Sequence, residues 1–352
     1  MRILVAVNQG YVGPVLGRHL RRVFPGAKLI GFDTGFFALS LTGARISPER
    51  VYDMQIHGDA RDIDASLLQG VDAVVALAAI SNDPMGARYE AVTDAVNRGA
   101  ALRLAGLAAS AGVKHFVFAS SCSVYGFAPG GARREGDALN PQTAYARSKI
   151  ATEQGLAAME LGAMTTTCLR FATACGMSDR LRLDLVLNDF VASAVAARKI
   201  NVLSDGSPWR PLIDVSDMAR AIAWAATRAP EQGGARLNVN VGAEAWNHQV
   251  RDLAYAVAES LPGVEVAINQ EAPPDSRSYK VDFSLYRELA PAHQPQMTLQ
   301  GSIAALKAGL EGMGFADAEF RASPYMRLKM LEAHRNAGRL DADLRWTPEA
   351  LA

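Results

Sequence analysis

The first half of the chain alternates short apolar runs with amphipathic stretches. Strands are expected at Arg2 to Val7, Ala27 to Phe32, Ala73 to Leu77, His115 to Ala119 and Thr165 to Arg170. Helices are expected at Val12 to Val23, Ala91 to Ala111 and Tyr145 to Leu161. Short apolar strands separated by helical patterns are typical of βαβ units, whose strands run parallel with helices on both faces. The pattern therefore predicts an α/β fold with a doubly wound parallel sheet.

Beyond about residue 176 helical and loop patterns dominate. One strand-like run, Arg236 to Val241, stands apart there, and we expect it to rejoin the parallel sheet. The chain is therefore predicted to form a large domain at 1–176 that regains a strand at 236–242. A smaller lobe and the C-terminal tail, at 177–235 and 243–352, would be interleaved with it.

Composition narrows the class of protein. Apolar residues make up 49% of the 352 residues, charged residues 20%, and the formal net charge is zero. This balance is typical of a globular protein and gives no support to nucleic-acid or membrane-surface binding. The three cysteines are odd in number and lie in apolar stretches, which favours a reducing compartment, the cytoplasm. No run approaches the ~18 apolar residues of a membrane span, and we predict no metal site.

The first expected strand leads into a glycine-containing turn and then a helix. Glycines at this point let the backbone approach a pyrophosphate, whose charge is stabilised at the helix N-terminus. Asp33 ends the second strand, where an acid accepts hydrogen bonds from adenosine ribose hydroxyls and repels the extra phosphate of NADP. We therefore predict NAD as cofactor, bound by Gly10, Tyr11, Val12, Gly13 and Asp33. The turn is imperfect, because Val7 stands at the first glycine of a G-x-x-G-x-x-G spacing.

Tyr145 and Lys149 stand four residues apart on an expected helix, so both side chains project from one face. An ammonium beside a tyrosine favours the phenolate, which can then take a proton from a substrate alcohol. Ser121, at the end of the strand just upstream, can hydrogen-bond the same reacting oxygen. A Tyr-x-x-x-Lys pair alone is usually a surface feature. Together with the Ser-Ser strand end and the dinucleotide turn, it indicates catalysis.

These motifs together resemble an extended short-chain dehydrogenase/reductase of the nucleotide-sugar epimerase/dehydratase group, over roughly residues 1–290. The resemblance implies a Rossmann-type sheet with a smaller substrate lobe. It also implies that Asp59 and Ala60 meet the adenine, that Asn97 supports the active site, and that Lys149 also contacts the nicotinamide ribose. The backbone along the cofactor would be that of Leu77, Ala78 and Ala79.

The resemblance also extends to the expected sugar-nucleotide site. It implies diphosphate contacts from Asn188, Arg210 and Arg277. A guanidinium suits this role because its planar donors hold phosphate bidentately. Solvated surface arginines are the alternative for the last two. The expected substrate-facing positions are completed by Cys122, Ser123 and Thr173.

Three departures from the family pattern bear on the reaction. Val7 replaces a glycine, which strains the turn if that residue needs a positive φ. Cys122 and Ser123 stand where 4,6-dehydratases of the group carry an Asp-Glu pair. Thr173 stands where hexose 4-epimerases commonly have an asparagine.

The expected reaction is epimerisation of a nucleotide-diphosphate sugar, at C4, through a transient keto sugar. A dehydratase or a reductase of the same family is the alternative. Cys122 keeps an unusual dehydration or a C3/C5 epimerisation open, although a buried small hydrophobe is the commoner role of such a cysteine. A non-catalytic NAD(P)-binding sensor is the alternative of another class, and such proteins typically lose the tyrosine or the lysine that are both present here.

The expected oligomeric state rests on the resemblance. Relatives often dimerise by packing two helices of each subunit into a four-helix bundle. The corresponding helices here lie near residues 91–111 and 143–162, which predicts a homodimer. The sequence assigns no role to the tail, including Leu340 to Trp346; capping of the sugar pocket and extension of the dimer contact are both open.

Overall fold

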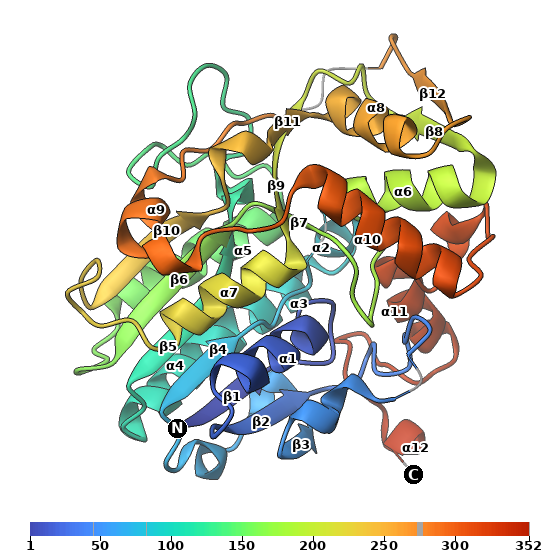
Figure 1. Cartoon of the computed structure of the whole chain (residues 1–352). Helices are drawn as coiled ribbons and strands as arrows, with labels where there is room; N and C mark the ends of the chain where they lie inside the picture. Colours follow the sequence, from blue (N-terminus) through green and yellow to red (C-terminus); the bar gives the residue numbers. More distant parts are fainter. Residues whose placement is uncertain (45, 82, 273–276, 352) are drawn as a thin grey trace.

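The computed structural model describes residues 1–44, 46–81, 83–272 and 277–351. Its centre is a sheet in which, among those residues, seven strands pair in the order β10-β6-β5-β4-β1-β2-β3, all parallel (Figure 1). The strands are β1 (Arg2–Ala6), β2 (Lys28–Asp33), β3 (Met54–His57), β4 (Ala73–Ala76), β5 (His115–Ser121), β6 (Thr165–Phe171) and β10 (Arg236–Val241). The predicted doubly wound sheet is thus confirmed, and so is the return of the strand at 236–241.

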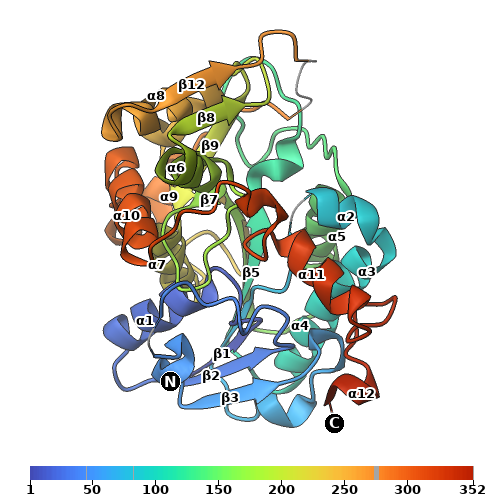
Figure 2. The ribbon, with the colours of Figure 1, turned by 90° about the vertical axis from the view of Figure 1, so that its right-hand side faces the viewer.

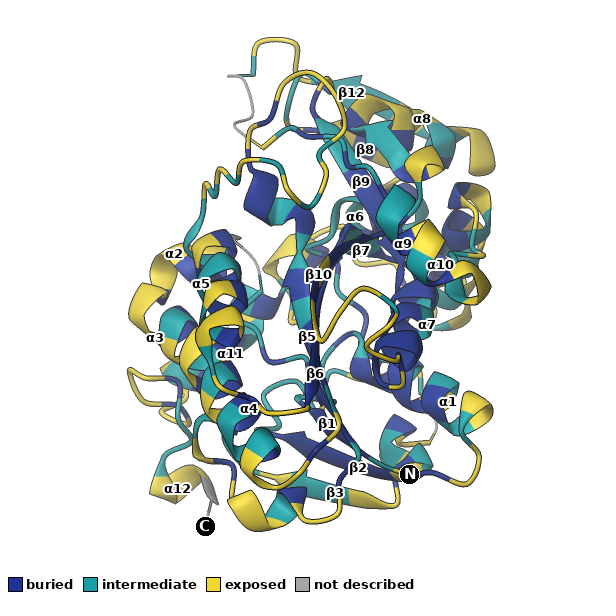
Figure 3. Cartoon of the chain, turned by 90° about the vertical axis from the view of Figure 1, so that its left-hand side faces the viewer, coloured by how far each residue is buried: buried dark blue, intermediate teal, exposed yellow. Residues whose placement is uncertain are grey.

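Each face of the sheet is covered by helices. Alternate residues of β1 supply the two cores: Ile3 belongs to one hydrophobic cluster and Leu4 to the other, because successive side chains of a strand point to opposite faces. Helices α1 (Gly13–Val23) and α7 (Val215–Ala225) cover the first face. Helices α4 (Ala100–Ser110) and α5 (Ala144–Ala158) cover the second. Figure 3 shows the buried sheet between these two layers.

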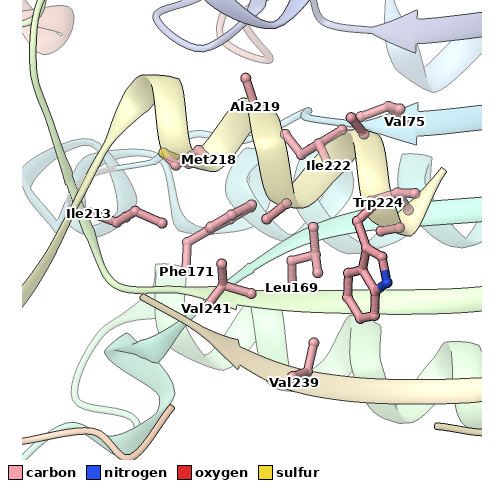
Figure 4. Close-up of a cluster of buried hydrophobic side chains, with 14 of the residues drawn as sticks. Val75, Leu169, Phe171, Ile213, Met218, Ala219, Ile222, Trp224, Val239 and Val241 are labelled. Atoms are coloured by element: carbon pink, nitrogen blue, oxygen red, sulfur yellow. The ribbon is translucent and has the colours of Figure 1, made fainter. Parts of the chain in front are cut away.

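The core between α7 and the sheet brings distant parts of the chain together. In Figure 4, Ile222 and Trp224 of α7 lie against Leu169 of β6 and Val239 of β10. The returning strand β10 therefore buries its apolar face in the same cluster as β1, β2, β4, β5 and β6. This packing explains why an apolar run so late in the sequence belongs to the first sheet.

The long helix expected at 91–111 is present, with one irregular turn. It runs through α3 (Glu90–Asp94), a π-helical turn at Ala95–Gly99 and then α4. Such π turns occur mostly inside α-helices and often at functional sites. The helix expected at 145–161 is α5, which ends three residues earlier than predicted.

The second lobe contains strands that the sequence did not predict. It combines helices α6 (Val186–Ala197), α8 (Val250–Ser260) and α10 (Leu299–Gly312) with short strands and a helix, α9 (Ser284–Leu289), that packs near β10. The short strands are β7 (Thr173–Cys175), β8 (Lys199–Val202), β9 (Trp209–Asp214), β11 (Asn247–Gln249) and β12 (Glu265–Ile268). Apart from β9, these strands have three or four residues each, too few for an alternating pattern to stand out, and the same holds for β3.

The chain ends on the first domain. After α10 it forms α11 (Arg327–Asn336) and α12 (Pro348–Leu351), and α11 lies beside α2 (Asp83–Arg88) and α3 in Figure 2. Buried side chains of this segment and of α2–α3 share one hydrophobic cluster. Among the described residues, no helix is both long enough and apolar enough to cross a bilayer.

Candidate active site

The candidate site lies at the carboxyl ends of the parallel strands, where the strand order reverses between β1 and β4. Ligands of open α/β sheets bind in the crevice at such a switch point. The loops after β1, β2, β3 and β4 all reach this edge. Most of the sequence-predicted cofactor residues stand on those loops.

The turn after β1 has a glycine-type conformation despite its valine. Val7 has a φ of +66°, in the left-handed region that a β-branched side chain avoids. A Cβ at Gly13 would lie 1.7 Å from the Asn8 carbonyl oxygen, so only glycine fits where α1 begins. A Cβ at Gly10 would meet nothing within 4 Å. The tight turn and the open space at Gly10 are what a close-lying pyrophosphate requires.

Tyr11 ties the turn to the second lobe. Its hydroxyl donates to the Gly176 carbonyl at 2.6 Å, and its own carbonyl accepts from Ser178 Oγ at 2.6 Å. Asn188 donates to the Tyr11 hydroxyl at 3.3 Å and to the Arg182 carbonyl at 2.9 Å, and it accepts from the Gly176 N–H at 3.0 Å. The fully buried Asn188 side chain thus bonds to protein groups, whereas the sequence assigned it to a sugar-nucleotide diphosphate.

Asp33 joins the turn to the loop after β2. One carboxylate oxygen accepts the Gln9 N–H at 2.8 Å and the other accepts the Gly35 N–H at 2.7 Å. Burial raises the pKa of this carboxyl, and the two hydrogen bonds oppose that effect. Each carboxylate oxygen has a further lone pair with which to accept a ribose hydroxyl.

Asp59 and Ala60 follow β3. The Asp59 carboxylate accepts from the Arg61 N–H at 2.8 Å and from the Arg61 guanidinium, and Arg345 of the tail lies 3.7 Å away. Although burial raises the pKa of Asp59, these hydrogen bonds and charges outweigh it and bring the pKa below its ordinary value. Ala60 is buried against Ala78, in the segment Leu77–Ala79 that follows β4.

The three catalytic candidates come from two neighbouring elements. Ser121 is the last residue of β5, and its hydroxyl accepts the Ser123 N–H at 3.1 Å. Tyr145 and Lys149 lie on the first turns of α5, with the Lys149 ammonium 5.4 Å from the centroid of the tyrosine ring. Thr143 caps this helix by accepting the Ala146 N–H at 3.2 Å. The structure therefore brings the predicted tyrosine and lysine together, beside the strand that ends in the serine.

Lys149 is buried at the base of the site. Its ammonium donates to the Ala119 carbonyl at 2.6 Å and lies 4.5 Å from the centroid of the Phe118 ring. Burial lowers the pKa of this ammonium to about 7, while the Glu153 charge opposes the effect. With such a pKa the lysine gains or loses its proton near neutral pH.

Asn97 holds the helix of the site against the loop after β4. In the π turn, its side chain accepts the Ile80 N–H at 2.8 Å and donates to the Ile80 carbonyl at 3.2 Å. It also donates to Ser148 Oγ at 3.0 Å, and that hydroxyl donates to the Tyr145 carbonyl at 2.8 Å. The asparagine thus contacts the Tyr145 backbone through one intermediate, the Ser148 hydroxyl.

A buried ion pair beneath Lys149 escaped the sequence analysis. Glu153 accepts from the Arg170 guanidinium at 2.7 Å and from Ser120 Oγ at 2.5 Å, and both charged side chains are almost fully buried. This pair fixes α5 against β5 and β6. The signal was present in the sequence, since Glu153 continues the four-residue spacing of Tyr145 and Lys149 along one helix face.

Of the residues after Ser121, one faces inward and one is unpaired. The Cys122 thiol is fully buried in a hydrophobic cluster and donates to the Arg170 carbonyl at 3.0 Å, and burial raises its pKa well above the ordinary range. Ser123 Oγ is shielded from solvent and makes no hydrogen bond with the described residues.

The remaining substrate candidates stand farther along the chain. Thr173 begins β7 and is partly buried, and it pairs with Leu212 of β9. Arg210 is partly buried on β9 and donates to the Trp209 carbonyl at 3.0 Å. Arg277 is exposed on the loop before β-bridge residue Ser278.

A dinucleotide fits these residues. Gly13 forms a cradle that a Cβ would fill, the turn has room at Gly10, and Asp33 offers free lone pairs at the end of β2. The donor set is that of a pyrophosphate and ribose site rather than a metal site.

Comparison with known proteins yields one family and several relatives. The family model described as the NAD dependent epimerase/dehydratase family matches residues 3–242. A UDP-glucose 4-epimerase of Mycolicibacterium smegmatis is 28% identical over 319 residues, covering 86% of this chain and 96% of that protein.

Solved structures share the architecture. A UDP-glucose-4-epimerase from Stenotrophomonas maltophila with bound NAD and formylated UDP-arabinopyranose is 22% identical with a TM-score of 0.77, covering 90% of this chain and 100% of that one. TunA, an NAD dependent NDP-hexosamine 5,6-dehydratase, is 22% identical with a TM-score of 0.76, covering 90% and 99%. At these identities the likeness shows the fold.

Proposed function

Because the chain belongs to the NAD-dependent epimerase/dehydratase family, we propose that this NAD-dependent enzyme inverts C4 of a nucleotide-diphosphate sugar through a transient keto sugar. The observation that carries the proposal is the pairing of Tyr145 with the buried Lys149 beside the strand that ends at Ser121. A non-catalytic sensor has no need of a buried ammonium, whose desolvation is costly.

Each of the three side chains has a distinct task in this proposal. Bound NAD supplies a hydride acceptor and donor. Tyr145 takes the proton of the C4 hydroxyl. It returns the proton to the same oxygen after the keto sugar has turned its opposite face toward the cofactor. Lys149 stabilises the phenolate by its charge, and Ser121 holds the reacting oxygen by a hydrogen bond.

The cofactor residues divide along the sheet edge. We propose that the backbone of Gly10 to Gly13 binds the pyrophosphate at the N-terminus of α1 and that Asp33 binds the adenosine ribose. Asp59 and Ala60 would face the adenine, and the segment Leu77–Ala79 would lie along the cofactor. Lys149 would also contact the nicotinamide ribose.

Epimerisation is favoured over dehydration by the surroundings of Cys122. Removal of water from the sugar needs a proton donor close to the leaving hydroxyl. The Cys122 thiol is packed in a hydrophobic cluster, with a pKa raised by burial, so it is a poor acid or base. Dehydration remains the alternative reaction, and the mass-spectrometric test distinguishes it from epimerisation by the loss of water.

Substrate contacts follow from the same geometry. The unpaired Ser123 hydroxyl is proposed to bind a sugar hydroxyl beside Ser121. Thr173 is proposed to face the sugar, and Arg210 and Arg277 to hold the diphosphate.

Assembly and location complete the proposal. We propose a homodimer through the helices near 91–111 and 143–162. The molar mass of the purified protein, measured by analytical ultracentrifugation, tests this proposal. The three cysteines, Cys122, Cys168 and Cys175, are buried and unpaired, which supports a reducing, cytoplasmic setting.

The test is mass spectrometry of UDP-, GDP-, dTDP- and CDP-sugars incubated with the purified chain and NAD. A new isomer of unchanged mass is expected, with inversion at C4 identified by NMR. Loss of water would replace epimerisation by dehydration, and a change of two hydrogens would mean a net oxidoreductase. If no sugar nucleotide reacts or binds, the proposed substrate class is wrong.

A further inference from the structure

The last part of the chain, residues 327–347, is here called the strap. The hydrophobic cluster of the second lobe includes Phe315 and Phe320 and is lined by Tyr325 and Met326 just before the strap. From Arg327 onward the buried apolar side chains of the strap belong instead to the cluster that contains Ile80 and Met85 of the cofactor domain. The second lobe is thus packed before the strap begins, so the strap has another role.

The strap is anchored at its start by a buried cation. The Arg327 guanidinium donates to the Arg180 carbonyl at 2.7 Å and stacks 4.4 Å from the centroid of the Phe37 ring. Phe37 stands in the loop that follows Asp33. Arg327 therefore ties the first residue of the strap to the carboxyl end of β2.

Two aromatic side chains bind the same loop directly. Trp346 Nε1 donates to the Thr34 carbonyl at 2.6 Å, and His334 Nε2 lies 3.0 Å from the Phe36 carbonyl, to which it donates. The Trp346 ring packs against Phe36 at a centroid distance of 5.8 Å and against His334 at 5.0 Å. The loop immediately after the ribose-binding candidate Asp33 is thus held by the strap.

The strap also binds the loop after β3. Arg61 donates to the Asp343 carbonyl at 2.8 Å while its guanidinium pairs with Asp59. Arg345 pairs with Asp62 and lies 3.7 Å from Asp59. Two loops of the cofactor domain are therefore bridged by one C-terminal segment.

A small hydrophobic core completes the contact. Leu331, Leu340 and Leu344 of the strap are buried against side chains on α2, α3 and the segment after β4. Leu344 has a φ of +54°, a strained conformation for leucine that persists only when surrounding contacts enforce it. The strap is thus a built part of the domain and not a loosely attached tail.

The position of these loops identifies what the strap encloses. In open α/β sheets the acid at the end of the second strand binds the adenosine ribose, so adenosine lies at the carboxyl ends of β2 and β3. We propose that the strap closes the adenosine end of the cofactor cleft and slows the release of NAD. The inference rests on the proposed function in one respect, since an enzyme that regenerates NAD in each cycle has no need to release it.

The test compares two strap variants with a control in the full-length protein loaded with labelled NAD. Trp346→Ala removes the hydrogen bond to Thr34 and the ring contacts, and Arg345→Ala removes the ion pairs to the β3 loop. Lys329→Ala removes an exposed cation from α11 that pairs with Glu332 alone among the described residues. Release of label into excess unlabelled NAD is measured, with thermal unfolding of each variant as a check on folding.

The expected result is a release rate raised about tenfold or more by Trp346→Ala and about threefold by Arg345→Ala, with Lys329→Ala unchanged. Unchanged release in both strap variants overturns the proposal. Slower release or tighter binding also overturns it, because the strap would then obstruct the cofactor. The readout is independent of the sugar, so failure to epimerise any sugar nucleotide would defeat the proposed function and leave this result standing.

Discussion

The two ends of the cofactor cleft are built differently. At the catalytic end, Ser121, Tyr145 and Lys149 stand on a regular strand and a regular helix, backed by the buried Glu153–Arg170 pair. At the adenosine end, Asp33 and Asp59 are followed by loops that are held in place by a segment about three hundred residues further along the chain.

This difference matches the different structural requirements of catalysis and of cofactor binding. Reacting groups need fixed geometry, which regular elements with buried polar support provide. A cofactor site must enclose the bound cofactor and still allow it to enter. Loops covered by a separate segment can meet both requirements. Substitutions at the catalytic end should therefore change turnover, whereas substitutions at the adenosine end should change cofactor affinity and folding stability.

The largest effect is expected from Tyr145→Phe. The variant keeps the ring but loses the hydroxyl that takes and returns the proton, so kcat should fall by about 10²–10⁴-fold. NAD affinity, measured by calorimetry, should be unchanged because the contacts of the adenosine end are intact. Turnover at the wild-type rate would remove the tyrosine from the mechanism.

Lys149→Met should lower kcat by about a hundredfold and stabilise the cofactor-free protein. Burial lowers the pKa of Lys149 in the folded protein to about 7 from 10.5. As pH falls from 10.5 to 7, the unfolded chain therefore binds the proton first, and the wild-type protein loses folding stability. The variant's gain over wild type should be largest below pH 7 and vanish near pH 10.5. Urea unfolding across this range measures it, and a gain independent of pH would contradict a buried ammonium.

Asp33→Asn is expected to act on the other end of the cleft. An amide nitrogen would face one of the two backbone N–H groups that the carboxylate accepts, leaving a buried donor unpaired. The free energy of unfolding should fall by about 2 kcal/mol, and NAD should bind roughly tenfold more weakly. Calorimetry and urea unfolding test this, and an unchanged kcat at saturating NAD separates it from the catalytic variants.

Val7→Gly should give the smallest effect, in the opposite direction. A left-handed valine costs about 1–2 kcal/mol, part of which is offset when glycine frees the unfolded chain. A net stabilisation of about 0.5–1 kcal/mol is expected from urea unfolding. Destabilisation would mean that the Val7 packing against Ala78 and Ala60 outweighs the strain.

The sequence predicted most of what regular structure determines. The strands of the first domain other than β3, the return of residues 236–241 and the Tyr145–Lys149 pairing follow from periodicity and spacing, which are local signals. The short strands of the second lobe were missed because β7 and β11 offer three residues each. Family membership also followed from the order of motifs, and the matched region 3–242 confirms it.

The adenosine end was harder to predict for a physical reason. Trp346 bonds a backbone carbonyl of Thr34, and a carbonyl leaves no mark in the amino-acid sequence. The same holds for His334 and the Phe36 carbonyl. Long-range contacts to backbone groups follow no rule of sequence spacing, so no role could be predicted for the strap.

The placement of β10 has a consequence for synthesis on the ribosome. Strand β6 is complete at Phe171, but its outer edge is paired only by β10, which begins at Arg236. Until β10 has been synthesised, the backbone N–H and C=O groups along the edge of the apolar strand β6 are unpaired. Such an exposed edge promotes aggregation. Chains that stop before residue 241 should therefore depend on chaperones. The part of the second lobe at 177–235 is synthesised before β10 can complete the sheet of the first domain.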